Sequence, residues 1–179
     1  TITDFKGQTT EYVYDEFGRR TAKNLYEAEA TTPSETIEST YDAWGRLDLL
    51  LEARGTTDYD YDARGNLVQF VSPEGTIGYE YDLFGRLTRT YTANSDIRYA
   101  NNVVLTTPEV TTYAYDLLGN LRETNLANGV NTTYAYDSLN RLTSVVTKTA
   151  LDELLASYVY DLAPDGRREG VTETRLEDD

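Results

Sequence analysis

Aspartate residues that could serve as paired catalytic carboxylates recur at regular intervals along the chain. Glycoside hydrolysis needs one carboxylic acid and one carboxylate at a set separation, and the sequence holds 31 acidic residues from which such a pair could be drawn. It holds no His and no Cys, which excludes Ser-His and Cys-His nucleophiles and histidine or thiolate metal sites. Carboxylates, Tyr, Lys and Arg are the side chains that remain for chemistry.

The aspartates that stand out share one sequence position, directly after a Tyr and shortly before a turn. They are Asp15, Asp42, Asp62, Asp82, Asp116, Asp137 and Asp161. Catalysis needs one special site, whereas recurrence at a fixed position indicates a structural requirement. We therefore expect no enzyme activity, no catalytic residue and no cofactor, with a carboxylate glycosidase as the minor alternative. No loop has the D-x-D-x-D-G spacing of a calcium site, so no metal site is predicted either.

The stretch from Thr76 to Leu87, TIGYEYDLFGRL, shows the recurring unit in full. Tyr79 and Tyr81 are two residues apart and so share one face of a strand. Asp82 follows at a position where a carboxylate can accept hydrogen bonds from turn amides. Gly85 supplies a left-handed residue for a three-residue hairpin loop with a bulge, and the next strand begins at Leu87.

Seven copies of this unit cover the chain, about 20 residues apart where nothing is inserted. The residues that define the copies are Tyr14, Asp15 and Gly18; Tyr41, Asp42 and Gly45; Tyr61, Asp62 and Gly65; Tyr81, Asp82 and Gly85; Tyr115, Asp116 and Gly119; Tyr136, Asp137 and Asn140; and Tyr160 and Asp161. Asn140 replaces Gly in the sixth copy, and Asn tolerates the left-handed conformation best after Gly. The seventh copy has a longer predicted turn through Pro164, Asp165 and Gly166.

The repeats predict an all-β fold in which antiparallel hairpins form one continuous twisted meander over residues 1–179. We interpret the insertions near residues 27–38 and 92–110 as enlarged connections between repeats. The stretch ALDELLA at 150–156 is expected to form a widened hairpin or a helical turn. The tail from Gly170 is expected to be frayed. Such a sheet ends in open edge strands, so an edge-to-edge homodimer is predicted.

Arg or Asn follows the turn Gly or Asn, and Trp44 lies in the variable part of the second turn. We expect each Arg to pair with a carboxylate of its own or an adjacent repeat. We expect the Tyr rings to stack across strands. The alternative is a carbohydrate-binding or adhesion module in which Trp44, the one aromatic residue outside the repeat pattern, is the candidate ligand contact.

The formal net charge of −15 disfavours nucleic acid and anionic membrane surfaces as partners. The sequence has no apolar run long enough to span a bilayer, so membrane insertion is not expected. It also has no Met, which leads us to expect an internal piece of a longer polypeptide.

The consensus Y-x-Y-D-x-x-G-R/N-L, with P-x-G or N-G turns between copies, resembles the YD repeat of the Rhs family. It is also similar to the YD shells of teneurins and of the C components of insecticidal toxin complexes. The resemblance implies an arc of a hollow β-sheet shell that encloses or displays another polypeptide such as a toxin domain. It also implies a secreted or cell-surface protein, and it favours a bacterial source. The family's D-P-x-G self-cleavage motif is absent, and Pro164-Asp165-Gly166 reverses its order, so no protease role is inferred.

Overall fold

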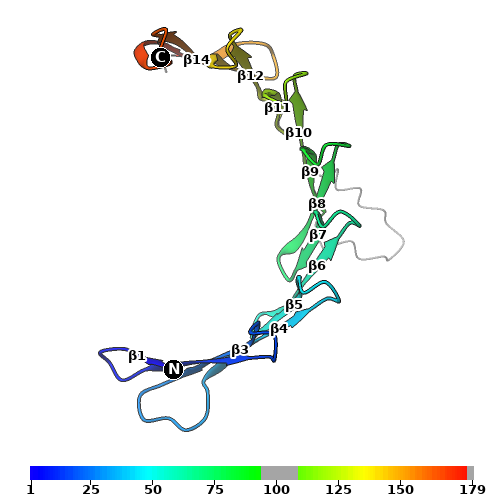
Figure 1. Cartoon of the computed structure of the whole chain (residues 1–179), viewed down its shortest axis with the longest axis vertical. Helices are drawn as coiled ribbons and strands as arrows, with labels where there is room; N and C mark the ends of the chain where they lie inside the picture. Colours follow the sequence, from blue (N-terminus) through cyan, green and yellow to red (C-terminus); the bar gives the residue numbers. More distant parts are fainter. Residues whose placement is uncertain (94–108, 177–179) are drawn as a thin grey trace. The chain divides into compact units, whose positions relative to one another are not determined.

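The computed structural model describes residues 1–93 and 109–176, and every regular element among them is a β-strand. The strands are β1 (Ile2–Thr3), β2 (Thr9–Tyr14), β3 (Arg20–Tyr26), β4 (Glu35–Tyr41), β5 (Leu47–Glu52), β6 (Gly55–Tyr61), β7 (Leu67–Ser72), β8 (Gly75–Tyr81), β9 (Leu87–Ala93), β10 (Glu109–Tyr115), β11 (Leu121–Asn125), β12 (Asn131–Tyr136), β13 (Leu142–Lys148), β14 (Leu154–Leu162) and β15 (Arg168–Arg175) (Figure 1). In these two ranges no helix is long and apolar enough to cross a membrane.

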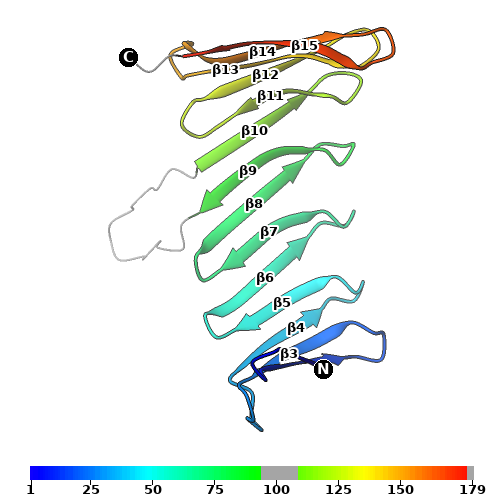
Figure 2. The same cartoon turned by 90° about the vertical axis from the view of Figure 1, so that its left-hand side faces the viewer.

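The strands are arranged in the sheet in the same order as in the sequence, from β1 to β15. Ladders are antiparallel, and each links a strand to the next one along the chain. The described residues fall into two compact units, 1–78 with 92–93, and 79–91 with 109–176. Within each unit the turns of the Tyr-Asp repeats lie on the same side of the sheet, at the ends of the strands (Figure 2). The predicted all-β hairpin meander is confirmed.

The turns of the first six repeats have the predicted geometry. In the fourth repeat the Gly85 amide donates to the Asp82 carbonyl at 3.0 Å, and the Asp82 amide donates to the Arg86 carbonyl at 2.9 Å. Gly85 has φ 78°, and Asn140 at the same position has φ 65°. The ladder shifts register beside these turns, for example between Thr40 and Tyr41, as a bulge requires.

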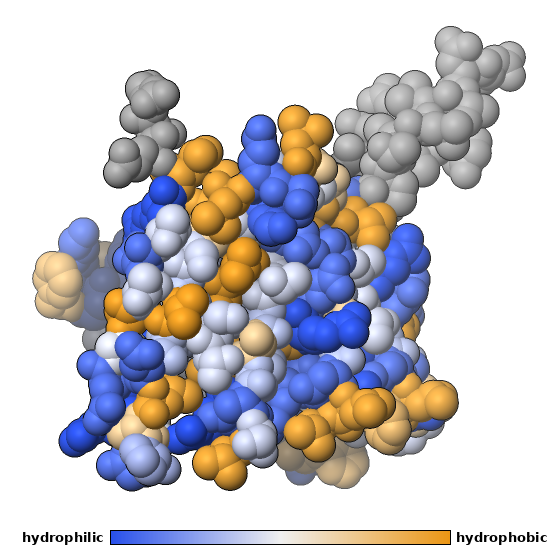
Figure 3. Space-filling model, turned by 90° about the horizontal axis from the view of Figure 1, so that it is seen from above, coloured by the Kyte–Doolittle hydropathy of each residue, from blue (hydrophilic) through white to orange (hydrophobic). Residues whose placement is uncertain are grey.

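The sheet has almost no buried core in the described part of the chain. Ala163 is the one hydrophobic side chain that is nearly inaccessible, at 4 % exposure, and no large side chain is fully buried. Hydrophobic groups are interspersed with polar ones over the face seen in Figure 3 (Figure 3). Hydrophobic burial is therefore distributed over many half-exposed strand residues, and other contacts must determine the register in which the strands pair.

Three expectations need correction. The seventh turn is not longer: the Ala163 amide donates to the Arg167 carbonyl at 2.8 Å, so Ala163 takes the turn position and Asp161 lies inside β14. The tail is not frayed at Gly170, because β15 continues to Arg175. The first insertion is shorter, since β4 already begins at Glu35.

The two remaining expectations concern the stretch at 150–156 and the second insertion. The stretch at 150–156 forms a hairpin turn in which the Thr149 amide donates to the Glu153 carbonyl at 2.8 Å, and its last residues belong to β14. Most of the second insertion, residues 94–108, lies outside the described residues.

Replacing Gly85 tests the backbone requirement alone, because a Cβ there would meet nothing within 4 Å. We expect Gly85→Ala to lower the free energy of unfolding by about 1 kcal/mol, the cost of a left-handed L-residue. Gly85→Asn should cost clearly less, as Asn140 occupies the equivalent conformation. Urea unfolding followed by circular dichroism measures both, and equal losses in the two variants would contradict the assignment.

Candidate functional site

The turn aspartates act as caps for the backbone of their own turns. In six repeats Oδ1 accepts the amides of the second and fourth residues after the Asp, at 2.8–3.0 Å. The six are Asp15, Asp42, Asp62, Asp82, Asp116 and Asp137. This leaves Oδ2 free to bind a side chain.

The Oδ2 atom holds the Arg or Asn that follows the turn Gly or Asn. Arg19, Arg46, Arg86 and Arg141 donate from Nε to the Asp of their own turn at 2.6–2.7 Å. Asn66 and Asn120 donate from Nδ2 at 2.9 Å in the same way. The expected Arg–carboxylate pairs are confirmed, and all lie within one repeat. Because Nε is bound, the plane of the guanidinium is fixed.

Each fixed guanidinium faces the next repeat. The Arg19, Arg46 and Arg86 guanidinium carbons lie 4.4–4.7 Å from the ring centroids of Tyr41, Tyr61 and Tyr115 respectively. Arg46 Nη1 also donates to the Asp62 carbonyl at 3.3 Å, and Arg141 Nη1 donates to the Ala163 carbonyl at 2.8 Å. The stacking partner of these tyrosines is therefore the arginine of the preceding repeat. The predicted Tyr stacking across strands is replaced by cation–π contact at these three positions.

The tyrosine hydroxyl completes the junction by donating to a backbone carbonyl of the preceding repeat. The acceptor is always the residue after the turn Arg or Asn: Tyr41 bonds Arg20, Tyr61 bonds Leu47, Tyr115 bonds Leu87 and Tyr136 bonds Leu121, at 2.7–3.0 Å. We call the combination of turn Asp, following Arg or Asn, and next-repeat Tyr the turn ladder. The tyrosine hydroxyl contact recurs at four junctions and the Arg–Tyr contact at three.

Trp44 takes part in this ladder. It is exposed as expected, at 81 %, and its ring lies 5.0 Å from the Arg46 guanidinium carbon. Phe17 over Arg19 and Phe84 over Arg86 repeat the contact at 5.1 and 5.2 Å. Trp44 is thus not outside the repeat pattern: it holds the position that Phe17 and Phe84 have in two other repeats, and Arg19, Arg46 and Arg86 each lie beside two aromatic rings.

An open groove of 480 Å³ lies beside Trp44, lined also by Tyr61 and Arg64. The Arg46 side chain on its wall is already engaged by Asp42 and Asp62. Contact of Trp44 with a ligand stays a prediction.

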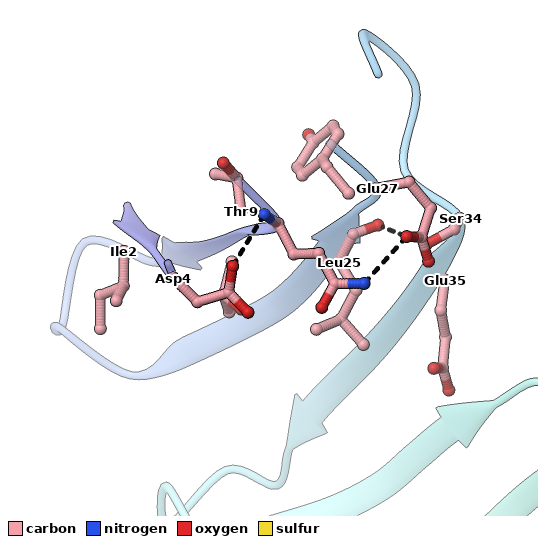
Figure 4. Close-up of a pocket in the computed structure, with 10 residues that line it drawn as sticks. Ile2, Asp4, Thr9, Leu25, Glu27, Ser34 and Glu35 are labelled. Carbon is pink, nitrogen blue, oxygen red and sulfur yellow. Dashed lines mark hydrogen bonds between the residues drawn. The ribbon is translucent and has the colours of Figure 1, made fainter. Parts of the chain in front are cut away.

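A second cavity, of 280 Å³, lies among β1, β2 and β3 and contains carboxylates (Figure 4). Asp4 Oδ1 accepts the Gln8 amide at 2.9 Å, and Glu27 accepts the Gln8 side chain at 2.9 Å. Glu35 lies on the same wall. The carboxylates of Asp4 and Glu27 thus hold the local backbone and side chains in place, which is a structural use of these groups.

Asp4 belongs to an additional turn of the same kind that the sequence analysis missed. Its Oδ1 also accepts the Lys6 amide at 2.8 Å, and Gly7 has φ 82°. The D-x-x-G spacing of Asp4 and Gly7 was the available signal, but no Tyr precedes it. At 149–153 a Thr replaces the Asp, since Thr149 Oγ1 accepts two turn amides at 3.2 Å.

Hydrogen bonding lowers the pKa of the capping aspartates in the six Tyr-Asp repeats. For Asp15, Asp42 and Asp82 partial desolvation acts to raise the pKa, but the turn amides and the Arg side chain outweigh it. In Asp62 and Asp116 the Asn side chain contributes most to the lower pKa, and in Asp137 the Arg141 amide does. Each cap is therefore held in its charged form.

Acid should weaken the fold for this reason. The folded state binds fewer protons than the unfolded chain, so the contribution is complete above the ordinary aspartate pKa of about 3.9 and is lost as pH falls through the lower folded value. We expect the urea concentration at the unfolding midpoint to decrease as the pH is lowered below about 4. Asp82→Asn, which cannot titrate there, should show a smaller fall than the parent protein. A flat midpoint down to about pH 2 in the parent protein would contradict the prediction.

The hydroxyl of the junction can be tested by Tyr115→Phe, which keeps the ring under Arg86 and removes the hydrogen bond to Leu87. We expect a loss of about 1 kcal/mol in the free energy of unfolding. Tyr14→Phe is the matched control, because Tyr14 is 58 % exposed and opens the first repeat. Equal losses for both variants, measured by urea unfolding, would argue against the junction.

Comparisons with known proteins agree with this geometry. A model of the teneurin YD-shell family matches residues 1–161, and no curated protein sequence matches the chain. Similar solved structures include the crystal structures of TcdB2-TccC3-Cdc42 (TM-score 0.64, 15% identity) and TcdB2-TccC3-TEV (TM-score 0.61, 15% identity). A Photorhabdus luminescens Tc holotoxin pore with a mutation in TccC3 gives a TM-score of 0.59 at 16% identity.

These likenesses show the fold, and the alignments cover 96% of this chain but 10% of each of those chains. The family match covers most of the sequence, including the six turns with a capping aspartate. The chain belongs to the teneurin YD-shell family.

Proposed function

We propose that this chain is a section of the wall of a shell that surrounds another polypeptide, such as a toxin domain. The observation that carries the proposal is the turn ladder, which joins repeats of a single-layer sheet by recurring contacts. A sheet with almost no core of its own is suited to separate two compartments rather than to build a catalytic cavity. The chain's share of the similar structures, 10% of each, fits a section of a larger wall.

The aspartates support a structural role in this wall. In six repeats the carboxylate that sequence analysis considered for catalysis is bound on both oxygens by its own turn. A general acid must instead present a proton to a substrate, and a carboxylate whose pKa is lowered is poorly suited to do so. Secretion or surface display is part of the same proposal, since a shell around a toxin serves delivery outside the producing cell.

The proposal is tested on the parent polypeptide that contains this chain. Treated with protease under native conditions, it should yield a protected internal polypeptide that co-elutes with the wall. The double variant Arg46→Ala, Arg86→Ala removes one ladder arginine from each unit and should speed cleavage of the enclosed segment. Arg54→Ala, at an exposed arginine outside the ladder, is the control. Cleavage of that segment at the same rate in the native parent as in isolation would refute enclosure.

A further inference from the structure

The turn between β11 and β12 contains the one Asn-Gly pair of the sequence, Asn128-Gly129. It lies in the second unit, at the strand ends opposite the turn ladder, and Asn128 is exposed (Figure 2). Gly129 has no side chain, so its backbone nitrogen can approach the carboxamide of Asn128 without steric hindrance. A backbone nitrogen is thus placed next to a side-chain amide carbon with which it can close a ring.

The carbonyl oxygen of the Asn128 side chain already has a hydrogen-bond donor. Its Oδ1 accepts the Val130 amide at 3.1 Å. Attack on Cγ places negative charge on this oxygen, and a donor fixed beside a developing oxyanion lowers the barrier to such an attack. The Val130 amide therefore favours reaction at Asn128 Cγ.

The attacking nitrogen, by contrast, is restrained by the turn. The Gly129 amide donates to the Leu126 carbonyl at 2.9 Å, and the Leu126 amide donates to the Val130 carbonyl at 2.8 Å. Gly129 must give up its amide proton before its nitrogen can attack, so the bond to Leu126 has to break first. Native proteins open locally and transiently at such sites. The bond between Asn128 and Val130 spans two residues and can persist when the turn opens.

We propose that Asn128 is a site of spontaneous deamidation that is gated by opening of the turn between β11 and β12. The Gly129 nitrogen loses its proton to water and bonds to Asn128 Cγ, and Nδ2 takes up a proton and leaves as ammonia, which closes a succinimide. Water then adds to one of the two ring carbonyls and opens the ring to aspartate or isoaspartate. Water is the one co-reactant, and the inference does not rest on the proposed wall function.

The two products differ in their effect on the turn. Asp165, at the equivalent place of the turn before β15, accepts the Arg167 amide at 3.0 Å, so an aspartate can take the role of Asn128. Isoaspartate adds a methylene group to the backbone of a turn that has no room for it, because a Cβ on Gly129 would lie 2.5 Å from Cβ of Ala150 in the neighbouring turn. The isoaspartate form should therefore disturb both turns.

Deamidation can be followed on the 179-residue chain by peptide mapping with mass spectrometry, which separates the asparagine, aspartate and isoaspartate forms. Samples are incubated at one pH, either in buffer or in enough urea to unfold the chain. We expect conversion at Asn128 in both, and faster conversion in urea, because the Gly129 amide is then no longer held. Asp165-Gly166 is the internal comparison: it has the same turn geometry, but an ionised carboxylate resists nucleophilic attack, so it should change more slowly.

A variant away from the reacting atoms tests the gate. Tyr136→Phe removes the hydrogen bond from β12 to the Leu121 carbonyl of β11, at 3.0 Å, and leaves Asn128 and Gly129 unchanged. Loss of this bond should make opening of the hairpin, and with it deamidation in buffer, about fivefold faster. Tyr14→Phe, at an exposed tyrosine in the other unit, is the matched control and should react at the rate of the parent chain. In urea all three chains should react at the same rate.

The products are tested by stability. The purified isoaspartate form should unfold at a lower urea concentration than the parent chain, whereas Asn128→Asp should unfold close to it.

Two results would refute the gate: equal rates in buffer for Tyr136→Phe and the parent chain, or equal rates in buffer and in urea. Absence of conversion in buffer over a period in which the urea sample converts fully would refute Asn128 as a reacting site of the folded protein.

Discussion

The carboxylate of the turn aspartate is the constraint on which the rest of the sheet depends. One oxygen binds two amides of the turn and so fixes the hairpin, while the other holds the Arg or Asn that follows. An arginine held at Nε has a fixed plane, and in this position the Arg86 guanidinium carbon lies 4.6 Å from the ring centroid of Tyr115 in the next repeat. Turn formation and repeat-to-repeat contact are thus two outcomes of one charged group.

The scarcity of a buried core makes this arrangement necessary. In most sheets a hydrophobic face specifies the register, because a slip of one residue would expose it. Here, among the described residues, most strand side chains are only partly buried, and hydrophobic and polar groups are mixed on the face seen in Figure 3. The register is instead pinned at the turn edge, where a tyrosine hydroxyl must meet one particular carbonyl and an arginine one particular ring.

The sequence predicted the features that depend on a few neighbouring residues, such as the turns. It missed features that depend on how strands and repeats pack against each other. Gly85, Asn140 and Asp82 have turn preferences that can be read from a few neighbours, so the hairpins and the all-β fold followed from the pattern. In the seventh repeat the Tyr-Asp pair was misleading, because the turn forms at Ala163. That position depends on how β14 pairs with β13 and β15, which the short Tyr-Asp pattern does not specify. Likewise, the contact of Trp44 with Arg46 depends on the clamped position of that guanidinium, which also lies beside Tyr61.

Contacts between strands involve sequence neighbours in the described part of the chain, and this has a mechanical consequence. A force that pulls the two ends apart would load the hairpins in series, and each could peel away after breaking its own aspartate, arginine and tyrosine contacts. Extension would then proceed in small, nearly equal steps instead of one abrupt rupture. Such a sheet would yield gradually under tension, and released hairpins could close again without disturbing those still folded.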